Sequence, residues 1–157
     1  MAGKLSLLVN KTAASTGAGI FTLGTGTAGS LRRFTVYDLT IGSSGTPSDG
    51  ALLYQIRRST DINTSATGTS GTLTSLDPAD QFAGIYQTLI NLTANPSTLN
   101  STLMLWPMNA RCTFRWLPTP GSEIVIPASG ASVGIVMLTP TATKAVALAG
   151  CVLVEVW

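Results

Sequence analysis

The 157 residues are enough for one domain with a proper hydrophobic core. Only 10% of them are charged, against about 25% in an average globular protein, and the net charge is +2. So weak a charge argues against a nucleic-acid partner, which calls for a basic patch or arm. Such a charge-poor surface also suggests that other subunits cover much of it.

No stretch of the sequence approaches the roughly 20 consecutive apolar residues of a membrane-spanning helix. No secretory signal is recognised near the N-terminus either. We therefore expect no membrane partner and synthesis in the cytoplasm of the cell. The abundance of Val, Ile, Leu and Thr argues against a disordered chain.

Residues 1–17 are expected to form an N-terminal arm. Leu5, Leu7 and Val9 alternate only loosely with other residues before the segment turns to Ser, Thr and Gly. Such an arm can add a strand to a neighbour, although a partly ordered terminus fits the pattern equally well. The arm residues expected to contact a neighbour or partner are Lys4, Leu5, Leu7, Val9 and Lys11.

Residues 18–157 are expected to form a single β-sandwich domain. Short β-rich runs alternate there with Gly- and Pro-rich turns, a pattern typical of a sandwich, a jelly roll or a barrel. The predicted strands are Gly19–Leu23, Leu31–Ile41, Ala51–Ser59, Gly71–Leu76, Gln87–Thr93, Thr102–Trp106, Arg111–Leu117, Ile124–Ile126, Val133–Leu138 and Ala145–Trp157. We predict an all-β, jelly-roll-like antiparallel sandwich.

One helix-start signal interrupts the strands. Asp77 can cap a helix and Pro78 suits its first position, which predicts one short helical turn with Phe82 packed inward. The polar segment 61–70 before it is expected to be a long exposed loop.

The sequence offers almost nothing for catalysis. It contains no histidine, which excludes Ser-His-Asp triads, Cys-His pairs and most zinc chemistry. Asp77 and Asp80 are a close pair of carboxylates, but capping explains them better. The segment 24–29 (GTGTAG) matches a dinucleotide-binding pattern formally, yet a strand rather than a helix follows it. We expect no catalytic residue, no cofactor and no metal.

The two cysteines, Cys112 and Cys151, lie among apolar residues of predicted strands. Buried free thiols are the expected state. A disulfide between them needs neighbouring strands, which the sequence leaves open.

Two arginine pairs lie in predicted strands that follow each other along the chain. In a hairpin they would form a small positive patch for an acidic partner, whereas solvated strand ends are the simpler explanation. The C-terminal tryptophan suits core packing or a subunit interface. The interface candidates are therefore Arg32, Arg33, Arg57, Arg58 and Trp157.

Four segments carry a resemblance: 76–80 (LDPAD), 109–116 (NARCTFRW), 120–128 (PGSEIVIPA) and 152–157 (VLVEVW). The chain resembles the jelly-roll decoration, or cement, proteins of tailed bacteriophages, more closely in its second half than in its first. The resemblance implies a non-enzymatic homotrimer. It would bind the outer surface of the major capsid protein shell, and so be located on the virion, and stabilise that shell.

Two other interpretations stay open. A receptor- or carbohydrate-binding β-sandwich, such as a fibre or spike head, would show exposed aromatic side chains in one groove. A coat protein that builds a shell by itself would be expected to carry a basic arm, whereas residues 1–17 hold only Lys4 and Lys11.

Overall fold

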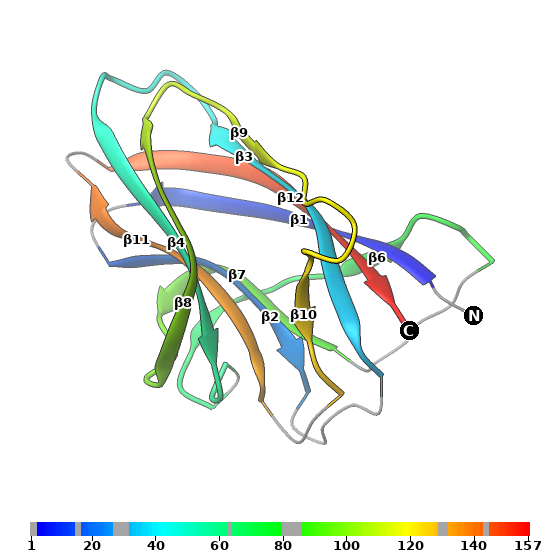
Figure 1. Ribbon diagram of the computed structural model, residues 1–157. Helices are drawn as coiled ribbons and strands as arrows, with labels where there is room; N and C mark the ends of the chain where they lie inside the picture. The colour runs from blue at the N-terminus through cyan, green and yellow to red at the C-terminus, as the bar shows by residue number, and fades with distance from the viewer. Residues whose placement is uncertain are drawn as a thin grey trace.

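The computed structural model describes residues 3–14, 17–26, 32–62, 64–79, 86–128, 132–142 and 145–157. Within these ranges, two antiparallel sheets pack against each other as a β-sandwich (Figure 1). The first sheet contains β1 (Gly3–Ala14), β3 (Phe34–Ser43), β6 (Leu73–Ser75), β9 (Phe114–Trp116), β10 (Ile124–Ile126) and β12 (Val146–Val156). The second sheet contains β2 (Ala18–Thr25), β4 (Ala51–Ser59), β5 (Thr67–Ser70), β7 (Tyr86–Ala94), β8 (Leu99–Asn109) and β11 (Gly134–Ala142).

The strand order is that of a jelly roll. The first sheet runs β10-β3-β12-β1-β6, with β9 also paired to β3, and the second runs β5-β7-β2-β11-β4-β8. Because β1 pairs with β12, β2 with β11, β3 with β9 and β10, and β4 with β8, the two halves of the chain form one long hairpin rolled into two sheets. The predicted jelly-roll-like sandwich is confirmed.

Alternation along the strands fills the space between the sheets. Leu7, Phe34, Tyr54 and Val152 are fully buried there, while their sequence neighbours point outward. Burial of one such side chain contributes roughly 1.5–3 kcal/mol. The inward faces of the strands therefore carry most of the stability.

The expected N-terminal arm is wrong for the described residues 3–14. They form β1, which lies between β12 and β6 inside the first sheet. Leu5, Leu7 and Val9 are buried in the core. Their alternation is that of a half-buried strand, and the domain includes this strand rather than starting after it.

The two flanks of the sandwich are closed in different ways. At one flank the chain crosses from β5 to β6, and Gly71 N–H donates to the Thr88 carbonyl at 2.9 Å. At the other, Trp106 lies between Tyr54 and Phe114, with ring centroids 5.7 and 4.5 Å away. Because Tyr54 belongs to the second sheet and Phe114 to the first, this aromatic stack joins the two sheets.

Two local expectations need correction. Asp77 Oδ1 accepts a hydrogen bond from Ala79 N–H at 2.9 Å, but residues 76–79 form a bend and turn without helix. The remainder of the predicted helical turn, including Phe82, lies outside the described residues. Cys112 is exposed in the connection after β8, where its N–H donates to the Asn109 carbonyl at 3.0 Å, whereas Cys151 is half-buried on β12; both thiols are free.

Candidate functional site

Two open depressions border the connection between β3 and β4. One, of about 330 Å³, is lined by Gly50, Ala51, Pro107, Met108 and Asn109. The other, of about 290 Å³, is lined by Ser44, Thr46, Pro47, Ser48, Ala145, Val146 and Ala147. These linings hold no acidic, basic or aromatic side chain, so they offer neither a proton-transfer group nor a stacking surface.

Neither a metal-binding cluster nor a membrane-spanning helix is found among the described residues. No group of three or more Cys, Asp or Glu side chains in them is placed to hold a metal ion. Their secondary structure includes no helix of the length and apolarity needed to cross a membrane.

The outer face of the first sheet is the candidate site. We call it the open face: the outward side chains of β1, β12 and β3, with Leu8, Tyr37, Cys151 and Leu153 in its apolar middle. Leu8 is 72% exposed. It stands in one row with Cys151 of β12 and Thr40 of β3, since these residues are paired in register. Apolar side chains that gather on one exposed sheet face, as Leu8, Leu153 and Tyr37 do here, are more common on surfaces that contact other proteins than singly exposed ones are.

A β-bulge shapes the middle of the open face. The register shifts between Leu153 and Val154, so that Tyr37 and Asp38 both lie near Leu153. The bulge therefore places the Tyr37 phenol and the Asp38 carboxylate beside Leu153 on the open face.

The charges of the open face are balanced. Arg115 on β9 donates hydrogen bonds from both Nε and Nη2 to the buried carboxylate of Asp38. The shortest of them is 2.6 Å, from Nη2 to Oδ2. Lys4 stands in register with Glu155, and its ammonium lies 5.7 Å from the centre of the Tyr37 ring. Two cations and two anions leave this face without net charge.

The two weak acids of the open face stay protonated at neutral pH. Burial, and then the neighbouring Asp38, raise the pKa of the Cys151 thiol. Burial also raises the pKa of Tyr37, with Glu155, Asp38 and Cys151 adding to the effect. Cys151 is therefore a poor thiolate nucleophile at neutral pH.

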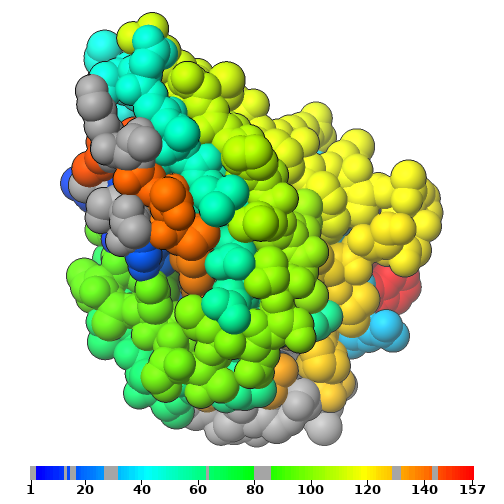
Figure 2. Space-filling model, turned by 60° about the vertical axis from the view of Figure 1, so that its left-hand side comes forward, coloured from blue at the N-terminus to red at the C-terminus, as the bar shows by residue number. Residues whose placement is uncertain are grey.

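The free edge of β8 is exposed along one flank (Figure 2), where Leu105 is 57% exposed. Ala110 N–H donates to the Gly50 carbonyl at 2.8 Å, so alternation along this antiparallel pair turns the backbone groups of Leu105 and Pro107 toward solvent. Pro107 has no N–H to offer. The edge is therefore a poor template for an added strand.

The arm residues predicted from sequence are separated by the structure. Lys4 lies on the open face, whereas Leu5, Leu7 and Val9 are in the core and cannot contact a partner. Lys11 donates to the Leu92 carbonyl on the flank, and burial lowers the pKa of its ammonium.

The hairpin expected to bring the two arginine pairs together is not formed. β3 and β4 lie in different sheets, so no hairpin brings the two pairs together. Arg57 donates to the carbonyls of Leu99 and Asn100, at 3.0 and 2.8 Å from Nη2. Arg58 reaches the Val125 carbonyl of the opposite sheet at 2.9 Å. These two guanidinium groups therefore support the fold.

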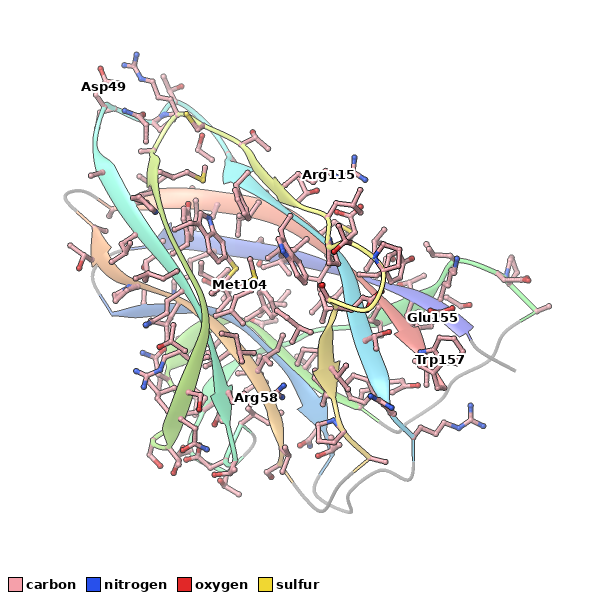
Figure 3. All side chains as sticks on the ribbon, in the orientation of Figure 1. Asp49, Arg58, Met104, Arg115, Glu155 and Trp157 are labelled. Atoms are coloured by element: carbon pink, nitrogen blue, oxygen red, sulfur yellow. The ribbon has the colours of Figure 1, made fainter. Side chains whose placement is uncertain are left out.

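The remaining candidates lie near the start of β3. Arg32 is half-buried and Arg33 is exposed. Trp157 is 61% exposed, its N–H donates to the Arg33 carbonyl at 2.8 Å, and its indole Nε1 lies 3.5 Å from Thr35 Oγ1. In Figure 3, Trp157 and Glu155 lie together at one end of β12, so Trp157 extends the open face at its border.

The sequence prediction missed the middle of the open face. Leu8 gave the only usable signal, because it places an apolar residue at an outward position between the inward Leu7 and Val9.

Searches for similar proteins found no match to the chain among protein-family models, curated proteins or solved structures.

Proposed function

We propose that this chain is a phage virion structural protein of the decoration type. It is a jelly-roll subunit that associates as a homotrimer and binds the outer surface of the shell formed by the major capsid protein. The observation that carries the proposal is the open face, with an exposed Leu8 in an apolar middle and charges that cancel. Surfaces of this composition favour burial against another protein.

The segments of family resemblance suggest the kind of partner. Residues 152–157 belong to β12, the central strand of the open face, and residues 109–116 include β9, which carries Arg115. Residues 120–128 include β10, so three of the four resembling segments contribute to this one sheet. We therefore assign the open face to contact with the shell or with the next subunit of the trimer.

The mechanism is mass action and breaks no covalent bond. A protein that binds only the assembled shell stabilises it by RT ln(1 + [L]/Kd), which is about 2.7 kcal/mol at a concentration of 100 Kd. Flat sheet faces suit this task because their hydrogen bonds are already satisfied within the sheet. Only side chains need to be ordered on binding.

A receptor- or carbohydrate-binding head is the alternative function. Sugar binding commonly uses aromatic side chains that stack on the ring, and the two depressions described above have none in their linings. The proposal therefore favours a protein partner.

Cosedimentation tests the proposal. The purified chain would be mixed with empty expanded shells of a phage that carries this gene, after its native mass has been measured by light scattering. We expect a mass three times that of one chain and saturable binding to shells. A monomer that ignores shells but binds a glycan array would overturn the proposal.

A further inference from the structure

The outer face of the second sheet differs from the open face because it is covered. Val136 and Leu138 of β11 point outward there and are buried together with Ala66 and Leu92. This small second core lies outside the sandwich. We call Val136, Leu138 and Leu92 the apolar floor, and residues 60–62 and 64–66, which follow β4 and include Ala66, the strap.

Ile62 of the strap sits in a socket made by two glycines. Gly24 and Gly134 are paired in register on β2 and β11. A Cβ at Gly134 would stand 2.8 Å from Ile62 Cδ1, and one at Gly24 would be nearer still. A Cβ at either glycine would also collide with a backbone carbonyl, that of Leu23 or of Val133, so glycine serves the close strand pairing as well as Ile62, which is 0% exposed. Ile62 N–H also donates to the Ser132 carbonyl at 3.2 Å.

A single carboxylate ties the strap to the turn before β8. Asp61 accepts from Ser59 Oγ at 2.8 Å, Ser65 Oγ at 2.6 Å, and the N–H groups of Ser97 and Thr98 at 3.0 and 3.1 Å. The Ser97 hydroxyl donates to it as well. Every one of these contacts needs an acceptor at Asp61, so a protonated or absent carboxylate leaves donors without partners.

We infer that the carboxylate of Asp61 holds the strap closed over the second sheet at neutral pH, and we call this carboxylate the catch. Protonation or removal of this carboxylate lets the strap lift and uncovers the apolar floor. The device is independent of the proposed docking, since the strap and the open face belong to different sheets.

The electrostatics agree with this geometry. Burial alone would raise the pKa of Asp61, but the hydrogen bonds from Ser65, Ser97 and Ser59 and from the Thr98 amide outweigh it and hold the pKa well below its ordinary value. The folded carboxylate is therefore charged at neutral pH and stays charged below the ordinary aspartate pKa of about 3.9, so its protonation needs a pH well below that value.

The groups that face Asp61 from its surroundings are hydroxyls and amides. They come from β4, from the strap itself and from the turn before β8. The two charged residues of β4 closest to the strap, Arg57 and Arg58, both bind elsewhere. Arg57 donates to the carbonyls of Leu99 and Asn100. Arg58 is bound to the carbonyl of Val125. Among the described residues, no ion pair joins either arginine to Asp61. The response to acid thus depends on this one carboxyl group.

Hydrogen exchange followed by NMR on the full chain tests the inference. In Asp61→Asn at neutral pH, we expect the hydrogen-bonded amides of Ile62, Ser97 and Thr98 to lose protection by about tenfold or more. Amides of β1 and β12 should change far less. Asp77→Asn is the matched control, because Asp77 caps only the exposed turn at Ala79.

Two results would overturn the inference. One is unchanged protection of the strap, and the other is an equal loss of protection in both sheets, which would make Asp61 a support of the whole fold. Should Asp61→Asn fail to fold, Ser97→Ala removes one hydroxyl donor and is expected to raise exchange at the same amides to a smaller extent. No change in Ser97→Ala would count equally against the catch.

Discussion

The two outer faces of this sandwich have the same secondary structure and opposite surroundings. On the first sheet, Leu8 is largely exposed and its neighbours form an apolar, electrically balanced surface. On the second, Val136 and Leu138 lie at equivalent outward positions but are buried under the strap. In this jelly roll, one outer face thus adds a second small core to the stability of the sandwich, whereas the other leaves its apolar side chains exposed.

The sequence of β11 already carries a trace of this difference. Gly134 to Leu138 (GIVML) is a continuous apolar run, which is typical of a strand buried on both faces. β1 instead alternates, with Lys4, Ser6 and Leu8 outward. Periodicity therefore separates a covered strand from an open one, although it does not show what the cover is.

The largest expected effect distinguishes the two faces by stability. Ile62→Ala removes a fully buried side chain from the glycine socket and should lower the free energy of unfolding by about 3 kcal/mol. Leu8→Ala on the open face should change it by less than about 0.5 kcal/mol. Urea unfolding of the two variants measures both values. Equal losses would show that the open face is also part of the stabilising core.

Removing the catch comes next in size. Asp61→Asn turns one accepting oxygen into a donor that faces other donors, so we expect a loss of about 2 kcal/mol at pH 7. Asp77→Asn should lower the free energy of unfolding by only about a few tenths of a kcal/mol, because the turn that Asp77 caps is exposed. The same urea titrations give both numbers, and similar losses in the two variants would contradict a special role for Asp61.

The third prediction concerns acid. The folded-state pKa of Asp61 lies below its ordinary value of 3.8, so its contribution is complete above about pH 4 and declines as the pH falls toward the folded-state pKa. Wild type should therefore lose stability relative to Asp61→Asn between pH 6 and pH 3. Unfolding curves at the two pH values check the sign. A stability advantage of wild type over Asp61→Asn that stays constant or grows in acid would contradict this prediction.

The smallest effect uses the two cysteines as internal probes. Cys112 is exposed, whereas Cys151 is half-buried on the open face with a raised pKa. A thiol reagent should modify Cys112 first, because little thiolate forms at Cys151. In the trimer or on a shell, Cys151 should become slower still while Cys112 keeps its rate. Mass spectrometry of the labelled chain follows both sites, and unchanged labelling of Cys151 in the bound state would place the contact elsewhere.

Much of the fold could be predicted from residue patterns. The strands Ala51–Ser59 and Ile124–Ile126 were predicted at their observed bounds, and the all-β sandwich follows from the turns between such runs. The N-terminal strand was missed because its partner, β12, lies at the other end of the chain. The alternation of residues 4–9 is compatible with a strand, but it does not show that β12 is the partner.

The parts that decide the candidate sites were harder to predict. Segment 61–70 is polar and was expected to be exposed, yet Ile62 is buried because two glycines of distant strands make room for it. Asp61 looked like a loop residue because its donors come from three segments that meet only in the folded chain. Alternation shows which residues of β1 share a face, but Leu5, Leu7 and Val9, which were expected to contact a partner, are on the inward face.

The central claim is that the open face, rather than any exposed apolar residue, binds the partner. The most direct measurement compares binding of Leu8→Lys and Leu105→Lys to empty expanded shells by cosedimentation. Both leucines are exposed, at 72% and 57%, but Leu105 lies on the β8 flank. The account predicts that Leu8→Lys stays folded and loses binding, since it buries a charge in the contact, while Leu105→Lys binds like wild type. Full binding by Leu8→Lys would contradict the account.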